Sequence, residues 1–379
     1  MAAGAQGPGK TDPLVGQVFA DRFRVEARLG QGGMGAVYRA HQLTLGRKVV
    51  IKVLELSGND PELDEMLVQR FKREATVTSR LSHPNTVGII DSGETPSGAL
   101  FIAYELLRGE TLEGRLLRVG RLDSAVIASI VVQICRSLGE AHDQGVIHRD
   151  LKPANVFLAL HPGEPDVVKV LDFGVARLVA PTDTHVTQIT KAGLTVGTPM
   201  YIAPEQAIGA AVDAPTDLYA LGVLLFELIT GEPPFDDPTP MGVALKHVRQ
   251  PPPPLYAVGL PRTTIDAWQP LVSALLSKKP EDRPQSALEV IGRVEKIAEA
   301  LSRKAPVQQP AADVAPTDTE APRATGPATD ALGSKSPRAS VTMGPSPDEA
   351  EVAPWYGTPG VLAILTFLAG LGLGIATGI

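Results

Sequence analysis

The order of two side-chain patterns along residues 18–302 is the feature that most restricts the fold of this chain. Strand-like segments come early: apolar and polar residues alternate at 23–27, and 49–53 is an apolar run with a single lysine. Longer segments with helical spacing come later, at 125–142 and 218–229. A small strand-rich part followed by a larger helix-rich part predicts an α+β fold of two lobes with a cleft between them.

The segments on either side of this body differ from it in composition. Residues 1–17 are small and polar with scattered Gly and Pro, which predicts a disordered leader. Residues 303–354 contain nine prolines and almost no large apolar side chains. Because such a segment cannot bury enough surface to fold, we expect a disordered Pro/Ala-rich linker.

The last segment, 357–379, carries no charge. A helix of this length would be about 34 Å long and could cross a hydrocarbon core of about 30 Å. Trp355 and Tyr356 precede it, where a membrane interface favours aromatic side chains. A buried core helix is the alternative, but the linker leaves it no core to join, so we expect a transmembrane helix. Glycines recur at every fourth position from Gly370 to Gly378, which indicates either a helix dimer or simply a glycine-rich helix.

Charge and cysteine content exclude two classes of protein. The 35 Lys and Arg residues are outnumbered by 42 Asp and Glu residues, giving a formal net charge of −7. This argues against a general nucleic-acid binder, which needs a basic face. Cys135 is the single cysteine, so a disulfide-stapled secreted fold is excluded and a reducing compartment is expected.

Two features of the strand-rich part could bind phosphate. Residues 30–37 read Gly-Gln-Gly-Gly-Met-Gly-Ala-Val, and such glycines let backbone N–H groups approach phosphate oxygens. A Rossmann loop would open a helix here, whereas the following Val favours a strand and hence a hairpin. Lys52 lies in an apolar strand, either as a snorkelling edge lysine or with its charge aimed at a ligand. Glu74, on the charged helical stretch 62–81, is either its partner or a solvated carboxylate.

The helix-rich part holds three more specific motifs. His148-Arg149-Asp150-Leu151-Lys152-Pro153-Ala154-Asn155 follows a helical run and precedes an apolar strand. A carboxylate, a lysine and an amide at this spacing supply a base, a phosphate contact and a metal ligand. Asp172-Phe173-Gly174 follows the apolar strand 167–171 and offers a second metal-binding carboxylate, and residues 197–205 read Gly-Thr-Pro-Met-Tyr-Ile-Ala-Pro-Glu.

With these five motifs in this order, the chain resembles the protein kinase family over about residues 19–300. The lysine of motif 150–155 and the Gly197-Thr198 pair resemble the serine/threonine class. The Gly-Gly-Met-Gly loop and residues 203–206, Ala-Pro-Glu-Gln, resemble the bacterial, eukaryotic-like (Hanks-type) branch. The resemblance implies a two-lobed kinase domain over residues 18–302 that transfers the γ-phosphate of ATP to Ser and Thr hydroxyls of proteins.

The resemblance also implies the nucleotide site. The residues that would cover ATP are Gly30, Gln31, Gly32, Gly33, Met34, Gly35 and Val37. Lys52 would hold the α- and β-phosphates and be kept in place by Glu74, while Glu105 and Leu107 would lie in the hinge that binds adenine.

The implied catalytic set lies in two further motifs. Asp150 would orient the substrate hydroxyl and accept its proton, and Lys152 would reach the γ-phosphate. Asn155 and Asp172 would bind Mg²⁺ or Mn²⁺, and Thr198 would help to define the acceptance of Ser and Thr. Two matches are structural: a buried ion pair between Glu205 and Arg283, and Asp217, which would steady the catalytic loop.

Regulation and location follow as expectations from the same resemblance. Arg149 precedes Asp150, as in kinases that are activated by phosphorylation, so we expect autophosphorylation in trans at Thr187, Thr190 or Thr195; an ordinary polar loop is the alternative. ATP and reducing conditions place the kinase in the cytoplasm, with residues 357–379 as a single-pass anchor in the cell membrane. A membrane-anchored pseudokinase scaffold is the rival interpretation, but Lys52, Asp150 and Asp172 are all present.

Overall fold

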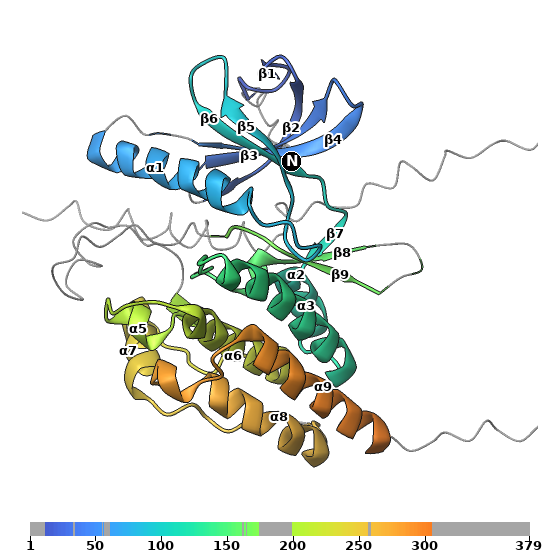
Figure 1. The fold of residues 1–379 in the computed structure, drawn as a ribbon, viewed down its shortest axis with the longest axis vertical. Helices are drawn as coiled ribbons and strands as arrows, with labels where there is room; N and C mark the ends of the chain where they lie inside the picture. Colours follow the sequence, from blue (N-terminus) through green and yellow to red (C-terminus); the bar gives the residue numbers. More distant parts are fainter. Residues whose placement is uncertain are drawn as a thin grey trace, which may run out of the picture. The chain divides into compact units, whose positions relative to one another are not determined.

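Strands and helices follow the predicted order in the computed structural model (Figure 1). It describes residues 12–32, 35–54, 56, 61–160, 163, 165–173, 199–256 and 259–304. All of these but Lys304 belong to one of the two units into which the chain divides. Most of the predicted linker 303–354 and the predicted membrane helix 357–379 lie outside the described residues.

The start of the chain differs from the sequence prediction. Residues 12–17, expected within a disordered leader, form a turn, and the rest of that leader lies outside the described part. The Asp12 carboxylate accepts hydrogen bonds from Arg28 (3.2 Å) and from the Tyr38 hydroxyl (3.1 Å). Leu14 packs against the apolar cluster of the adjacent sheet. These contacts offset the ordering cost of a segment whose composition alone predicts no structure.

The strand-rich part is one antiparallel sheet with the strand order β1-β2-β3-β4-β6-β5. Its strands are β1 (Val18–Phe19), β2 (Phe23–Gly32), β3 (Gly35–Gln42), β4 (Arg47–Leu54), β5 (Ile89–Glu94) and β6 (Leu100–Glu105). Helix α1 (Pro61–Thr78) contacts β4, β5 and β6 and lies beside the sheet in Figure 1.

Strand β4 shows how the sheet positions the site. Val49 and Ile51 belong to the apolar cluster on one face, and Val50 and Leu54 to the cluster on the other. Because side chains alternate along a strand, Lys52 shares the face of Val50 and Leu54. The predicted strand is therefore buried on both sides, and Lys52 lies on the face whose apolar cluster also contains Leu171.

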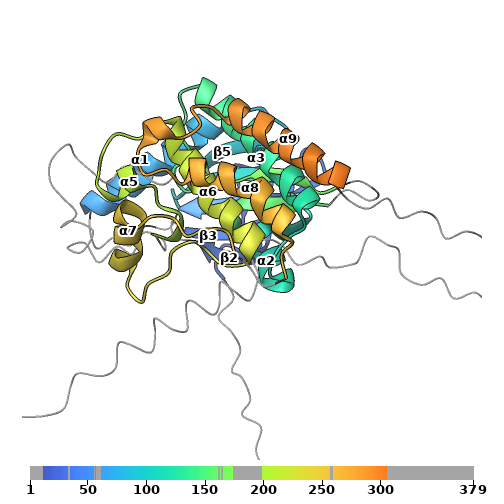
Figure 2. The same cartoon turned by 90° about the horizontal axis from the view of Figure 1, so that it is seen from below.

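The helix-rich part begins with a three-stranded sheet of order β7-β8-β9. Its strands are β7 (Gly109–Thr111), β8 (Val156–Ala159) and β9 (Val167–Val170). The helices are α2 (Leu112–Val119), α3 (Ser124–Asp143), α5 (Pro204–Ala207), α6 (Ala214–Thr230), α7 (Pro240–Arg249), α8 (Arg262–Leu275) and α9 (Ala287–Lys304), seen from below in Figure 2. Among the described residues of this lobe, 3-10 turns are formed by η1 (Pro153–Asn155), η2 (Pro199–Tyr201) and η3 (Pro280–Asp282).

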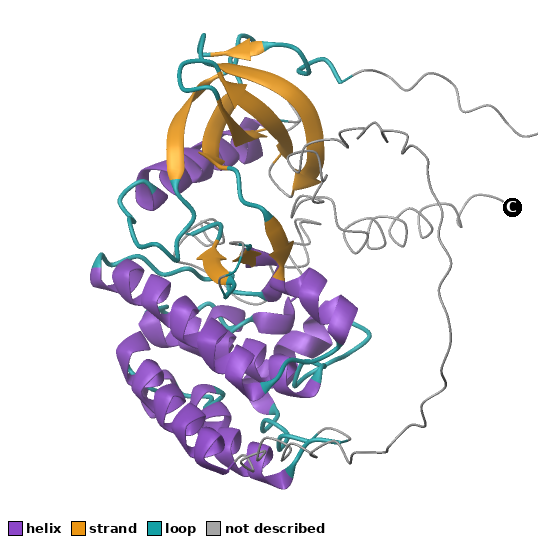
Figure 3. Ribbon diagram, turned by 90° about the vertical axis from the view of Figure 1, so that its right-hand side faces the viewer, coloured by secondary structure: helices purple, strands orange, loops and turns teal. Residues whose placement is uncertain are grey.

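Helix α6 is the centre of this larger lobe, where Figure 3 shows helices packed against one another. It begins after Asp213, whose side chain accepts from the Ala214 N–H (2.8 Å), and ends at Gly231 in the left-handed conformation (φ 91°). It is buried on nearly every side and contacts α3 and α8. A helix that is apolar all round belongs in a core.

Helix α3 meets the length and composition of a membrane span. Half of its apolar window is buried, and its side chains, including Ile127 and Leu138, belong to the main core cluster. Within the described ranges it therefore acts as the core helix of a folded lobe.

Candidate active site

The glycine-rich segment forms the hairpin between β2 and β3. Gly30 pairs with Val37 and Gly32 with Gly35, so a strand follows the glycines, as predicted. Gly35 has φ 152°, in a region that side chains other than glycine rarely adopt. Gln31 is exposed near the tip and accepts a hydrogen bond from Arg28 (3.1 Å).

Lys52 meets Asp172 across a separation of 120 positions in the sequence. The Nζ atom of Lys52 lies 3.2 Å from Oδ1 of Asp172. Burial alone would raise the pKa of Asp172, but the charge and hydrogen bond of Lys52 lower that pKa below its usual value. Asp172 is therefore a carboxylate at neutral pH, in a left-handed backbone conformation (φ 55°).

Asp150 stands at the centre of a second group of contacts. Its Oδ2 accepts hydrogen bonds from Nζ of Lys152 (2.7 Å) and from Nδ2 of Asn155 (3.0 Å). Asn155 also donates to the backbone C=O of Asp150 (2.8 Å). The contacts with Lys152 and Asn155 hold Oδ2 in place and fix the orientation of the carboxylate.

The backbone that carries Asp150 is anchored from α6. The buried carboxylate of Asp217 accepts from the N–H groups of His148 and Arg149, both at 2.8 Å. The His148 ring accepts from the Asp150 N–H at Nδ1 (3.3 Å), so its proton lies on Nε2 and is donated to the C=O of Leu171 (2.8 Å). His148 thus joins the loop of Asp150 to the residue before Asp172. The two hydrogen bonds that Asp217 accepts from this loop confirm its predicted supporting role.

One buried apolar cluster contains residues of both lobes. Its members include Val37, Val50, Leu107 and Leu171. The side chain of Glu105 accepts from the Gly88 N–H (2.8 Å) and from Nζ of Lys169 (2.7 Å), and its own N–H donates to the Gly88 C=O (3.0 Å). A contact between Glu105 and adenine would therefore come from its backbone C=O.

The oxygen donors of Asn155 and Asp172 fit a hard divalent cation. The amide nitrogen of Asn155 is the atom that donates to Asp150, which leaves its carbonyl oxygen as the ligand. Asp172 supplies a charged oxygen, because its pKa is lowered. Mg²⁺ is commonly held by one or two such groups together with substrate phosphates.

Several predicted residues lie outside the described part of the chain. They are Gly33, Met34, Thr187, Thr190, Thr195 and Thr198. Glu74 lies in α1, but its side chain is not described, so its pairing with Lys52 stays a prediction.

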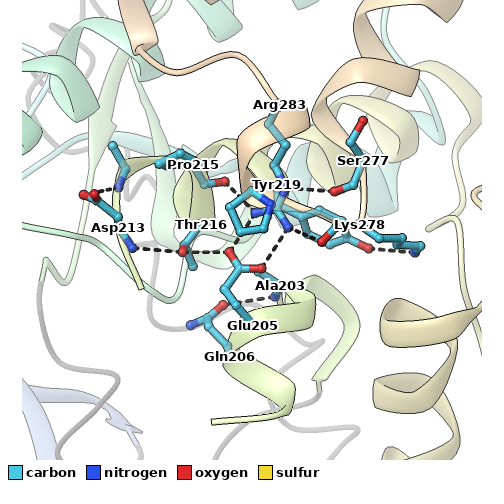
Figure 4. A network of polar contacts seen from close by, with 12 residues as sticks. Ala203, Glu205, Gln206, Asp213, Pro215, Thr216, Tyr219, Ser277, Lys278 and Arg283 are labelled. Carbon is cyan, nitrogen blue, oxygen red and sulfur yellow. Dashed lines mark hydrogen bonds and ion pairs between the residues drawn. The ribbon is translucent and has the colours of Figure 1, made fainter. Parts of the chain in front are cut away.

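The predicted ion pair of the large lobe is present and buried (Figure 4). Nη1 and Nη2 of Arg283 donate to the two carboxylate oxygens of Glu205 at 2.7 and 2.8 Å. Thr216 donates to the same carboxylate (2.8 Å). Burial would raise the pKa of Glu205, but these hydrogen bonds and the charge of Arg283 lower it.

Sequence reasoning missed two residues that hold the site together. Lys169 lies in the apolar strand β9, and this is the same signal that singled out Lys52. Gln206 donates to the C=O of Arg149 (2.9 Å), next to Asp150. The sequence marked Gln206 as the last residue of the Ala-Pro-Glu-Gln motif, three residues after Ala203 at the start of a helix, but gave no sign of this contact.

Comparison with known proteins gives a family match over the same body. The family described as "Protein kinase domain" matches residues 23–293. The serine/threonine-protein kinase pkn3 of Myxococcus xanthus is 45% identical over 277 residues, which cover 73% of this chain and 50% of pkn3. The serine/threonine-protein kinase PknB of Mycobacterium tuberculosis is 39% identical over 277 residues, covering 72% of this chain and 42% of PknB.

A solved structure agrees with these relatives. The crystal structure of the Mycobacterium tuberculosis PknI kinase domain has 29% sequence identity and a TM-score of 0.56, over 74% of this chain and 98% of that domain. The chain spans half or less of the length of the curated relatives pkn3 and PknB.

Proposed function

Since the chain belongs to the protein kinase family, we propose that it transfers the γ-phosphate of ATP to serine and threonine hydroxyls of protein substrates. The observation that carries the proposal is the convergence of Lys52 on Asp172 (3.2 Å) beside the contacts of Asp150 with Lys152 and Asn155. These are the charged groups that phosphoryl transfer needs for positioning and charge neutralisation.

The reaction assigns a role to each of these side chains. Asp150 receives the substrate hydroxyl at Oδ1, because Oδ2 is held by Lys152 and Asn155. The hydroxyl oxygen attacks the γ-phosphorus, its proton passes to Asp150, and the bond to the bridging oxygen of ADP breaks. Lys52 and Lys152 bring positive charge to the phosphates. Mg²⁺ or Mn²⁺, bound by Asn155 and Asp172, would offset further phosphate charge.

The nucleotide would bind between the hairpin and the apolar cluster that contains residues of both lobes. The glycines of β2 and β3 allow the backbone to approach the phosphates. Val37 and Leu107 offer apolar surface to the adenine ring, in the cluster that also holds Val50. Gly33, Met34 and Glu74 belong to this proposal through the family resemblance alone.

Transfer of labelled γ-phosphate from ATP to a generic protein substrate tests the assignment. Asp150→Asn is expected to reduce the turnover by at least about 100-fold, since it removes the acceptor of the proton. Asp143→Asn, at the exposed end of α3, is the matched control and should keep wild-type turnover. Equal incorporation by wild type and Asp150→Asn would refute the role of Asp150. A wild type that is inactive with Mg²⁺ and Mn²⁺, after incubation with ATP, would favour the pseudokinase scaffold.

We further propose activation by autophosphorylation in trans. Arg149 stands next to Asp150, and a phosphate on Thr187, Thr190 or Thr195 would supply a charged partner for such a basic residue. Mass spectrometry of the purified active protein should find phosphate on at least one of these threonines. Unmodified threonines in an active sample would contradict the proposal.

Membrane anchoring is the last part of the proposed function. Residues 357–379 have the length and composition of a single span, which would hold the kinase domain at the cytoplasmic face of the cell membrane. Their glycine spacing would suit a dimer of such helices. Detergent-free fractionation should recover the full chain with membranes, and recovery in the soluble fraction would count against the anchor.

A further inference from the structure

The backbone just before Asp150 is held in an unfavourable conformation. Arg149 has φ 68°, which costs free energy for a residue with a side chain. Contacts on both of its peptide groups maintain that conformation. Its N–H donates to Asp217 (2.8 Å), and its C=O accepts from Nε2 of Gln206 (2.9 Å). That carbonyl belongs to the peptide bond that leads into Asp150, so its direction constrains the backbone from which the Asp150 side chain projects.

The amide of Gln206 has a second partner at its other end. Its Oε1 accepts a hydrogen bond from the N–H of Ala203 (3.0 Å). Because a carbonyl can only accept and an N–H can only donate, these two partners determine which end of the amide is oxygen. Gln206 is 7% exposed, so water competes little for either contact. The buried amide therefore joins two backbone segments.

The helix that carries Gln206 is itself firmly held. The preceding residue, Glu205, binds Arg283 through both carboxylate oxygens and accepts from Thr216. Figure 4 shows Gln206 beside Glu205, with its hydrogen bond to Ala203. Arg283 in turn donates to the C=O of Pro215 in α6 (3.0 Å). The ion pair thus fixes the position of the residue next to Gln206, and so the position from which Gln206 donates to the C=O of Arg149.

We propose that Gln206 is a positioning residue for Asp150, acting through the C=O of Arg149 and coupling that loop to the segment that ends at Ala203. The inference rests on the proposed kinase activity. Loss of the Gln206 donor frees the peptide plane before Asp150, and the carboxylate then spends less time aimed at the substrate hydroxyl. Misplacement of a catalytic group costs up to about 100-fold in rate, so a fall in kcat of about 10-fold or more is expected.

A purely structural role makes a different prediction for one substitution. Gln206 is the third residue of α5, where a Glu side chain can accept the Ala203 N–H equally well and suits the positive end of a helix. If Gln206 served only as a cap, Gln206→Glu could lower the stability of the protein but would leave kcat per binding site unchanged. As a positioning residue it fails, because a carboxylate has no N–H for the C=O of Arg149 and places an anion against it.

Steady-state kinetics of the full chain separate the two roles, with rates expressed per nucleotide-binding site to correct for unfolded protein. Gln206→Glu and Gln206→Met should lower kcat about 10-fold or more, with the KM for ATP within about 2-fold of wild type. The control is Gln269→Glu on α8. The Gln269 amide also has two partners, since it accepts from the Leu255 N–H and donates to the Ser273 hydroxyl. This control variant should keep the wild-type kcat.

The outcomes are distinct from those that test the proposed function. A Gln206→Glu protein that keeps kcat within about 2-fold of wild type overturns the positioning role, and so does a loss that affects only the number of binding sites. If the wild type transfers no phosphate, the proposed function itself has failed. An active wild type together with an inactive Asp150→Asn protein secures the assay on which the Gln206 comparison depends.

Discussion

The side chain of Arg283 should tolerate no replacement, including lysine. Its guanidinium is fully buried and donates five hydrogen bonds. The acceptors are both carboxylate oxygens of Glu205 and the backbone C=O groups of Ser277, Lys278 and Pro215. A lysine ammonium has fewer donors and lacks the planar fork that matches a carboxylate.

The expected cost follows from counting these acceptors. Lysine at position 283 could satisfy at most three of the five, so two acceptors that are buried or part-buried would lose their partners. At about 1.5 kcal/mol each, Arg283→Lys should lower the free energy of unfolding by about 3 kcal/mol. Arg283→Met leaves the Glu205 carboxylate buried without a counter-charge and should cost about 3–5 kcal/mol.

The pH dependence supplies an independent check on the same pair. In the wild type the pKa of Glu205 is lowered, so its stabilising contribution is present above the unfolded value of 4.5 and is lost as the pH falls. In Arg283→Met, burial is no longer opposed by Arg283, and the pKa of Glu205 should rise. As the pH falls through this raised pKa, Glu205 becomes protonated and the free-energy cost of burying its charge disappears. The stability gap between the two proteins should narrow from pH 7 towards pH 4.5.

Urea unfolding followed by circular dichroism measures both effects. The matched control is Arg293→Met, which breaks the exposed pair with Glu289 on α9 (2.6 Å) and should cost less than about 1 kcal/mol. A loss of under about 1 kcal/mol for Arg283→Met would refute the reasoning. A gap that is the same at pH 7 and at pH 4.5 would show that Glu205 is not the group responsible.

Two further predictions concern the packing and acid stability of the larger lobe. Gly222→Ala should lower the free energy of unfolding by about 1–3 kcal/mol, because its Cβ would lie 2.7 Å from Cβ of Leu275. Gly139→Ala is the control: its Cβ would lie 3.9 Å from its nearest packing neighbour, so the change should be neutral or stabilising. Equal effects of the two substitutions in urea unfolding would contradict this account. Burial, together with the charge of Lys278, lowers the pKa of His247 from 6.5 to about 4. Between pH 6.5 and pH 4 the unfolded chain therefore binds more protons than the folded protein. The free energy of unfolding should fall by up to about 3 kcal/mol as the pH drops from 6.5 to 4. His247→Asn should remove that part of the pH dependence of the unfolding free energy, and an unchanged dependence would argue against it.

Local patterns along the chain were sufficient to predict the two-lobed fold. The apolar run at 49–53 correctly predicted a strand, and it is apolar because side chains on successive residues face two opposite buried clusters. The apolar run at 218–229 correctly predicted a buried helix, since a helix without a polar face needs neighbours on all sides. The glycine-rich segment was predicted as a hairpin because a valine followed it, and β2 and β3 pair there.

The start of the chain shows the limit of such patterns. Residues 12–17 have the composition of a disordered segment, yet Asp12 binds Arg28 and Tyr38, which lie further along the chain. A partner so distant leaves no trace in local composition. The same limit applies to Glu105, where the sequence indicates a hinge but does not reveal that Lys169 and Gly88 occupy its side chain.

The proposed chemistry could be read from the sequence, because two carboxylates, two lysines and an amide stand there in family order. Only the tertiary structure decided how these groups are held: Lys52 against Asp172, and Asp150 between its hydrogen-bonding partners and the amide of Gln206. The physical reason is that the residue types present set which charges and donors are available, whereas hydrogen-bond direction and pKa depend on distances of about 3 Å between segments far apart in the chain.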